Sequence, residues 1–275
     1  MTLLQRRAEF DPQQGCAESS YACDLPKPAW EKLCLFMSSL SRVLGDIQQL
    51  FAAHGNATTN VWYILTAAVM TTLNFPQDIP EVYRLAVKSI DASSKSEEQK
   101  LMDKEQIVMR LREGLLKTFI ASGFPKTINA LQHLSSVTPD EIRTRLPNTP
   151  IRKEQTWEDV QDQRNRGRTL FGKIYERHTH RILANMHTSH PDLAQAALHQ
   201  LYGPILSETS VISARETSLV VVAGLMAQDL PGQLRGHVYG ALHNGSTKDE
   251  VKRVEKLVAL LSRHYQTESK EPAKL

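Results

Sequence analysis

The spacing of apolar residues is the feature that most constrains how this chain can fold. Between Trp30 and Ala53, leucines and other apolar side chains recur every three or four residues, and similar spacing returns along most of the chain. Glycine and proline are scarce, at 13 each in 275 residues, and runs of valine and isoleucine bounded by turn residues are nearly absent. Because this spacing places apolar side chains on one face of a helix, the sequence predicts an all-α fold.

The predicted helices fall into two groups, separated by a stretch that is rich in proline and charge. We divide the chain into a loose arm (1–29), a first helical half (30–145), a linker (146–168), a second helical half (169–266) and a polar tail (267–275). Each half contains a buried apolar helix, a proline-containing turn and a second helix. The halves align at three pairs of residues: Pro76 with Pro231, Ala68 with Ala223, and Ala86 with Ala241. This similarity predicts a duplicated helical unit.

Composition excludes several classes of protein. The formal net charge is only +3 and no dense basic block is present, so a nucleic-acid partner is not expected. The longest apolar runs, Val61–Met70 and Leu219–Ala227, are well short of the roughly 20 residues of a membrane-spanning helix. Three clustered cysteines, Cys16, Cys23 and Cys34, are not a disulfide framework and favour a reducing compartment.

The last three residues, Ala273, Lys274 and Leu275, form a conservative variant of the Ser-Lys-Leu peroxisomal address. The residues before them are polar, as expected for a tail that is presented to a receptor. The alternative is a solvated terminus without function. We favour the address, which predicts a location in the peroxisomal matrix and an import receptor as partner.

One stretch of the second half carries a recognisable pattern. Arg215 and Glu216 begin an apolar helix, and the segment from Leu234 to Glu250 places His237, Ala241, Gly245, Thr247 and Glu250 at fixed spacing. Upstream lies the aromatic–glycine segment Leu201-Tyr202-Gly203. This pattern resembles the carboxymuconolactone decarboxylase and AhpD-like superfamily, in particular its fungal-type peroxisomal members that lack a Cys-x-x-Cys pair.

The resemblance implies an AhpD-like helical bundle that assembles into a homo-oligomer, with Glu216 and His237 as the catalytic pair. The peroxidase branch of the family has two cysteines just before this histidine, whereas residues 229–236 contain none. Thiol chemistry is therefore not expected at the usual site. The remaining enzymatic branch implies proton transfer at a carbon next to a carbonyl, as in a decarboxylase or isomerase, without metal or cofactor. The small-molecule substrate is not identified.

Other interpretations stay open for each of these residues. Ser213 and Glu216 have the spacing of a capping box, so Glu216 can serve the helix N-terminus alone. His237 can be a hydrogen-bonded interface residue, and a straight helical hairpin would place His243 rather than His237 level with Glu216. In the first half, valines occupy the matching positions. A non-catalytic peroxisomal binding or assembly protein is thus the alternative function, and a divergent hydroperoxide reductase is a third.

A histidine cluster in the second half is interpreted as a solvated helix end rather than a metal site. Its members are His178, His180, His187 and His190. Residues two apart on a helix point in different directions, so His178 and His180 would not face one ion.

Overall fold

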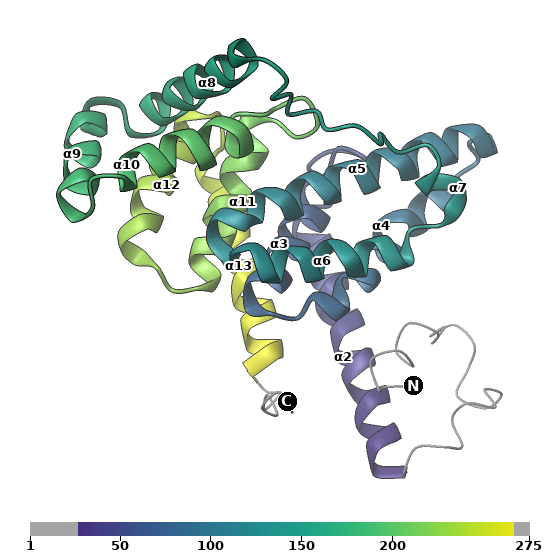
Figure 1. The fold of residues 1–275 in the computed structure, drawn as a ribbon. Helices are drawn as coiled ribbons and strands as arrows, with labels where there is room; N and C mark the ends of the chain where they lie inside the picture. The colour runs from purple at the N-terminus through teal and green to yellow at the C-terminus, as the bar shows by residue number, and fades with distance from the viewer. Residues whose placement is uncertain (1–26, 267–275) are drawn as a thin grey trace.

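The computed structural model describes the backbone of residues 27–266 and the side chains of residues 39–266. This part of the chain is helical and contains no strand, which confirms the predicted all-α fold (Figure 1). None of its helices is both long and apolar enough to cross a membrane. The cysteine side chains and the C-terminal tripeptide Ala273, Lys274 and Leu275 lie outside the described residues.

The first half is built around one almost completely buried helix. In α3 (Trp62–Leu73), every residue except the last is buried, as its apolar composition requires. The other elements surround it: α2 (Lys27–Leu50), a short 3₁₀ turn (η2, Pro76–Asp78), α4 (Ile79–Asp91), α5 (Glu97–Ser122), α6 (Phe124–Val137) and α7 (Asp140–Arg143).

The second half contains an outer layer and an inner hairpin. The outer elements are α8 (Trp157–Tyr175), η3 (Glu176–His178), α9 (Thr179–Ser189), α10 (Leu193–Ala196) and the π-helix η4 (Ala197–Leu206). The hairpin is α11 (Ala214–Ala227) and α12 (Pro231–His243), followed by α13 (Lys248–Gln266). Part of the expected linker is therefore helical, because Thr156 and Asp159 form a capping box that starts α8.

The two halves share one hydrophobic core. Helix α11 packs on α3 and α5, and α13 packs on α2 and α3. Buried residues of both halves, such as Val69 and Ile107 from the first and Val222 and Leu257 from the second, belong to one cluster. Figure 1 shows α11 between the first-half helices and the outer helices α8 to α10.

A smaller core lies beneath the outer layer and brings α8 against η4. Phe171 and Ile174 of α8, Tyr202 of η4 and Val221 of α11 are among its members. The two elements approach closely at Gly167, where an added Cβ would lie 2.5 Å from the backbone nitrogen of Gly203. This contact holds Tyr202 beside the end of α8.

The turns of the two inner hairpins have the same backbone geometry. Asn74 and Asp229 both have positive φ angles, 68° and 53°. Their N–H groups donate to carbonyls three residues back, those of Thr71 and Met226, both at 3.1 Å. The next residue in each turn donates to a carbonyl five residues back, and a proline follows. The equivalent positions are 155 residues apart, which is the same offset that aligns Pro76 with Pro231.

Candidate functional site

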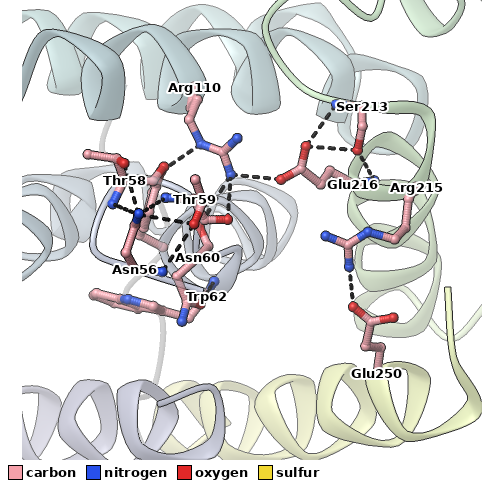
Figure 2. Close-up of polar contacts among 11 residues, drawn as sticks. Asn56, Thr58, Thr59, Asn60, Trp62, Arg110, Ser213, Arg215, Glu216 and Glu250 are labelled. Carbon is pink, nitrogen blue, oxygen red and sulfur yellow. Dashed lines mark hydrogen bonds and ion pairs between the residues drawn. The ribbon is translucent and has the colours of Figure 1, made fainter. Parts of the chain in front are cut away.

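Glu216 lies in the first turn of α11, where its carboxylate is enclosed by donors. One oxygen accepts hydrogen bonds from the backbone N–H and the hydroxyl of Ser213, at 2.8 and 2.9 Å. The Ser213 hydroxyl in turn accepts from the N–H of Glu216, so the predicted capping box is present. The other oxygen accepts from Arg110 of α5, at 2.8 Å (Figure 2).

Arg110 ties Glu216 to the first half of the chain. Its Nε donates to the Tyr63 hydroxyl at 2.7 Å. The nitrogen that meets Glu216 also lies 3.2 and 3.3 Å from the carbonyl oxygens of Thr59 and Asn60 (Figure 2). Both Arg110 and Glu216 are buried. The contact therefore links the start of α11 with α5 and with the loop before α3.

That loop is fixed by its own side chains. The Asn56 side-chain oxygen accepts from the backbone N–H groups of Thr58 and Thr59, each at 3.0 Å. The Asn60 side-chain oxygen accepts from the N–H of Trp62 at 3.1 Å. Because asparagine side chains commonly stabilise turns in this way, the carbonyls that face Arg110 are held in place.

The charge of Glu216 follows from these contacts. Burial by itself would raise the pKa of this carboxyl, but Arg110 and the hydrogen bonds from Ser213 outweigh burial and hold the pKa below its usual value. Glu216 is thus ionised at neutral pH and paired with a buried cation. Removing one partner of such a pair leaves the other charge buried without compensation.

Two further residues of the sequence pattern join helices. Glu250 accepts from the N–H of Thr247 at 2.8 Å and so caps α13. Its other oxygen accepts from Arg215, which connects α11 with α13 (Figure 2). Arg215, Thr247 and Glu250 are therefore engaged in structural contacts.

His237 lies on α12 and faces the outer layer. Its Nε2 is 3.3 Å from the Tyr175 hydroxyl and 3.4 Å from the Tyr202 hydroxyl, and the two hydroxyls are 3.1 Å apart. The imidazole is buried, and burial lowers its pKa to about 4. Burial also raises the pKa of Tyr175, and that of Tyr202 still further. At neutral pH the cluster is therefore a neutral imidazole with two protonated phenols.

The structure does not bring the two sequence-predicted residues together. No hydrogen bond or ion pair joins Glu216 to His237 among the described contacts, in which Glu216 meets Arg110 and Ser213 while His237 meets two tyrosines. His243 does not face Glu216 either. Its Nδ1 lies 3.2 Å from the Ile174 carbonyl oxygen, and its Nε2 lies 3.6 Å from Glu176.

A pocket of about 620 Å³ adjoins the histidine–tyrosine cluster. Tyr175 and Gly236 are part of its wall, whereas His237 is not. An added Cβ on Gly236 would lie 2.9 Å from the Tyr175 ring, so only glycine leaves the ring in its present position. Tyr175 therefore stands between the pocket and His237. In the part of the chain that the structure describes, no three histidine, cysteine or acidic side chains are grouped as metal ligands.

Sequence reasoning missed Arg110, and it missed Tyr175. Arg110 is 106 positions from Glu216, and Tyr175 is 62 positions from His237, so no local pattern connects them. Tyr202 was visible as part of an aromatic–glycine segment, but its contact with His237 was not.

Comparison with known proteins extends these observations. The family model described as Carboxymuconolactone decarboxylase family matches residues 192–262. The chain is 30% identical to Peroxisomal protein 2 of Saccharomyces cerevisiae, over 74% of this chain and 88% of that one. It is 33% identical to Peroxisomal protein 2 of Schizosaccharomyces pombe, over 73% of this chain and 85% of that one. The chain belongs to the carboxymuconolactone decarboxylase family. No solved structure matches it significantly.

The family assignment confirms the resemblance read from the sequence. Both yeast relatives are named as peroxisomal proteins, and the location of this chain is accordingly peroxisomal. The segment that matches the family model contains Tyr202, Glu216 and His237. Arg110 and Tyr175 lie outside it, so the charged partner of Glu216 and the pocket-lining partner of His237 come from the rest of the chain.

Proposed function

We propose that this protein is a peroxisomal, cofactor-free enzyme that transfers protons at a carbon next to a carbonyl, as in isomerisation or decarboxylation. The observation that carries the proposal is that Tyr175 lines a pocket while its hydroxyl lies 3.3 Å from Nε2 of a buried, neutral imidazole. Small-molecule sites are commonly pockets of this size with a few polar groups and a residue of shifted pKa.

Tyr175 is the group that would meet the substrate, and His237 acts through it. A proton leaves the substrate carbon for the Tyr175 oxygen while the Tyr175 hydroxyl proton passes to Nε2 of His237. Reversal of the two transfers returns a proton to another carbon, so the protein ends as it began. Tyr202 donates to whichever of the two atoms accepts. Burial makes the imidazolium form costly, and an enolate anion in the pocket offsets that cost because the two charges are opposite.

Glu216 has a different part in this proposal from the one that the family resemblance implied. Its two oxygens are occupied by Arg110 and Ser213, so it clamps α11 to the first half. It does not orient His237, because the tyrosines do so.

The test uses the purified full-length protein and two probes, acetoacetate and a γ-lactone with an acidic C–H. Proton NMR in D₂O follows deuterium entry at carbon and loss of carboxylate. We expect Tyr175→Phe and His237→Gln each to lower the rate by about 10²–10⁴-fold. Tyr83→Phe, a matched change in α4, should keep the wild-type rate.

The pH profile separates proton transfer from a merely structural effect. The wild-type rate should fall as the pH approaches 4, where His237 becomes protonated, whereas the small residual rate of His237→Gln should lack this step. Equal rates in wild type and in both site variants would contradict the proposal.

A non-catalytic binding or assembly protein is the second candidate, and one observation favours it. His237 is only 9% exposed and does not itself line the pocket. Ligand binding without turnover of any carbon acid, in a protein that folds normally, would support this candidate. A hydroperoxide reductase would need a thiol, and a triple Cys→Ser variant of Cys16, Cys23 and Cys34 that still consumes peroxide would exclude that chemistry.

A further inference from the structure

The pocket beside Tyr175 is lined by more positive than negative charge. Arg177, Arg181 and Arg235 belong to its wall, and Glu176 is its one carboxylate. The arginines come from different elements: Arg177 from η3, Arg181 from α9 and Arg235 from α12. The three arginines and the one glutamate together contribute a net charge of +2 to the pocket.

These three arginines have no acidic partner in the described part of the chain. Arg177 and Arg181 contact the ring nitrogens of His178, at 3.5 and 3.3 Å, and Arg235 makes no ion pair. Glu176 instead lies 3.6 Å from Nε2 of His243.

Several arginines elsewhere in the described part of the molecule are paired. Arg84 meets Glu81, Arg143 meets Asp140, and Arg145 meets both Glu98 and Glu105. Exposed arginines without an ion pair, such as Arg42 and Arg112, also occur elsewhere among the described residues, but here three of them line a single pocket. The geometry leaves their donors for an anion that the chain itself does not supply.

We propose that the pocket binds the phosphate group of a small phosphorylated compound. This inference rests on the proposed function, because it names the class of substrate that Tyr175 would meet. A carboxylate carries one charge and two oxygens, which one guanidinium fork satisfies. A phosphate monoester carries about −1.5 to −2 charges and three strong acceptor oxygens, and so matches a site with three arginines and a net charge of +2.

The rest of the pocket suits the organic part of such a compound. Ile174 and Ile182 supply apolar surface, and Tyr239, which is 58% exposed, supplies an open aromatic face. A volume of about 620 Å³ holds a compound larger than phosphate alone. With the phosphate at the arginines, the organic part extends along the wall that contains Tyr175.

Isothermal titration calorimetry on the full chain tests the proposal with phenyl phosphate and benzoate, which share a ring but differ in charge. We expect phenyl phosphate to bind about tenfold more tightly than benzoate. Each of Arg177→Gln, Arg181→Gln and Arg235→Gln should weaken phenyl phosphate binding about tenfold, and the triple variant should abolish it. Arg112→Gln, which removes an exposed arginine that does not line this pocket, should leave binding unchanged.

Several outcomes would overturn the phosphate site. They are equal affinity for the two probes, an equal loss in Arg112→Gln, or binding only to phosphatidylcholine vesicles that contain phosphatidic acid. The last result would assign the arginines to a membrane headgroup outside the pocket. Thermal unfolding of each variant shows whether it is folded.

Failure of this inference is distinguishable from failure of the proposed function. Tyr175→Phe and His237→Gln should keep phenyl phosphate affinity within about twofold, since neither residue supplies the charge that binds the phosphate. Phosphate binding without carbon-acid turnover would thus refute the proton transfer alone, and turnover without phosphate binding would refute the phosphate site alone.

Discussion

The two inner hairpins, α3–α4 and α11–α12, have the same turn geometry but carry different side chains at two matched positions. In the first hairpin, the positions that match Glu216 and His237 are Val61 and Val82, which are 5% and 0% exposed. In the second, the same positions carry a buried carboxylate and a buried imidazole. The backbone unit is therefore compatible with either an apolar or a polar interior. The side chains that pack against this unit decide whether its interior is apolar or polar.

The polar residues of the second hairpin are satisfied by residues from other elements. Arg110 reaches Glu216 from α5, while Tyr175 and Tyr202 reach His237 from α8 and η4. Burying an unpaired polar group is costly, so Glu216 and His237 would not be stable without these partners. The first hairpin needs no such partners.

We expect the largest loss of stability when Glu216, which links α11 to α5 through Arg110, is replaced by the valine found at the matching position of the first hairpin. Glu216→Val leaves the Arg110 charge buried, and we expect a loss of about 3–5 kcal/mol in the free energy of unfolding. The double variant Arg110→Met/Glu216→Val should recover part of this loss because it leaves no charge behind. Urea denaturation of wild type, both single variants and the double variant measures the coupling. A loss below about 1 kcal/mol in Glu216→Val would show that the pair is not a clamp.

The pH dependence of stability should distinguish the hairpins next, because the first hairpin carries Val82, which does not titrate, at the position that matches His237. The pKa of His237 is about 4 in the folded protein, below its value of about 6.5 in an unfolded chain. The unfolded chain therefore binds more protons between these pH values. Stability is complete above about pH 6.5 and decreases by about 3 kcal/mol as the pH falls to 4.

Chemical denaturation of wild type and His237→Gln across this pH range isolates the contribution, since carboxylates titrate equally in both proteins. Parallel curves would mean that His237 is not held neutral by the fold.

Adding a single methyl group where α8 packs on η4 should lower the stability of the protein, because these two elements of the outer layer are in close contact. Gly167→Ala places a carbon against the backbone of Gly203, and we expect a loss of about 1–3 kcal/mol. Gly172→Ala on the same helix has open space around it and should stabilise the protein by up to about 1 kcal/mol. Thermal unfolding compares the two variants. Similar effects of both would indicate that α8 and η4 are not in close contact.

We expect the smallest loss of stability from substitutions in the two hairpin turns, and we expect that loss to be equal in both. Asn74 and Asp229 have left-handed backbone angles, which cost a residue such as alanine about 1 kcal/mol or more. Asn74→Ala and Asp229→Ala should therefore each destabilise the protein by about 1 kcal/mol. A loss at only one of the two positions, measured by urea denaturation, would argue that the turns are not equivalent.

The sequence predicted the inner helices well, since α3, α5 and α11 have apolar patterns that burial requires. It placed the start of α8 too late. Residues 164–168 are charged and contain Gly167, which is typical of a linker, although this glycine serves the contact with η4. The Thr156–Asp159 capping box was the local signal that marks the true start.

The candidate site was predictable only in part, for a physical reason. Glu216 and His237 belong to a local pattern and could be read from their spacing. Their partners are set by how α5, α8 and η4 pack on the hairpin, and that packing depends on contacts far apart in the chain. The three arginines of the pocket also come from separate elements, so no run of basic residues in the sequence indicated a positively charged site.

The contact between Arg110 and Glu216 has a consequence for synthesis of the chain on the ribosome. The two residues are 106 positions apart, so at about 5–20 residues per second Arg110 emerges roughly 5–20 s before its carboxylate partner. During that interval the carbonyls of Thr59 and Asn60 and the Tyr63 hydroxyl are its native acceptors. Until Glu216 is synthesised, the first half therefore carries the uncompensated charge of Arg110 on the surface that α11 later covers. This favours completion of the shared core only when the second hairpin arrives.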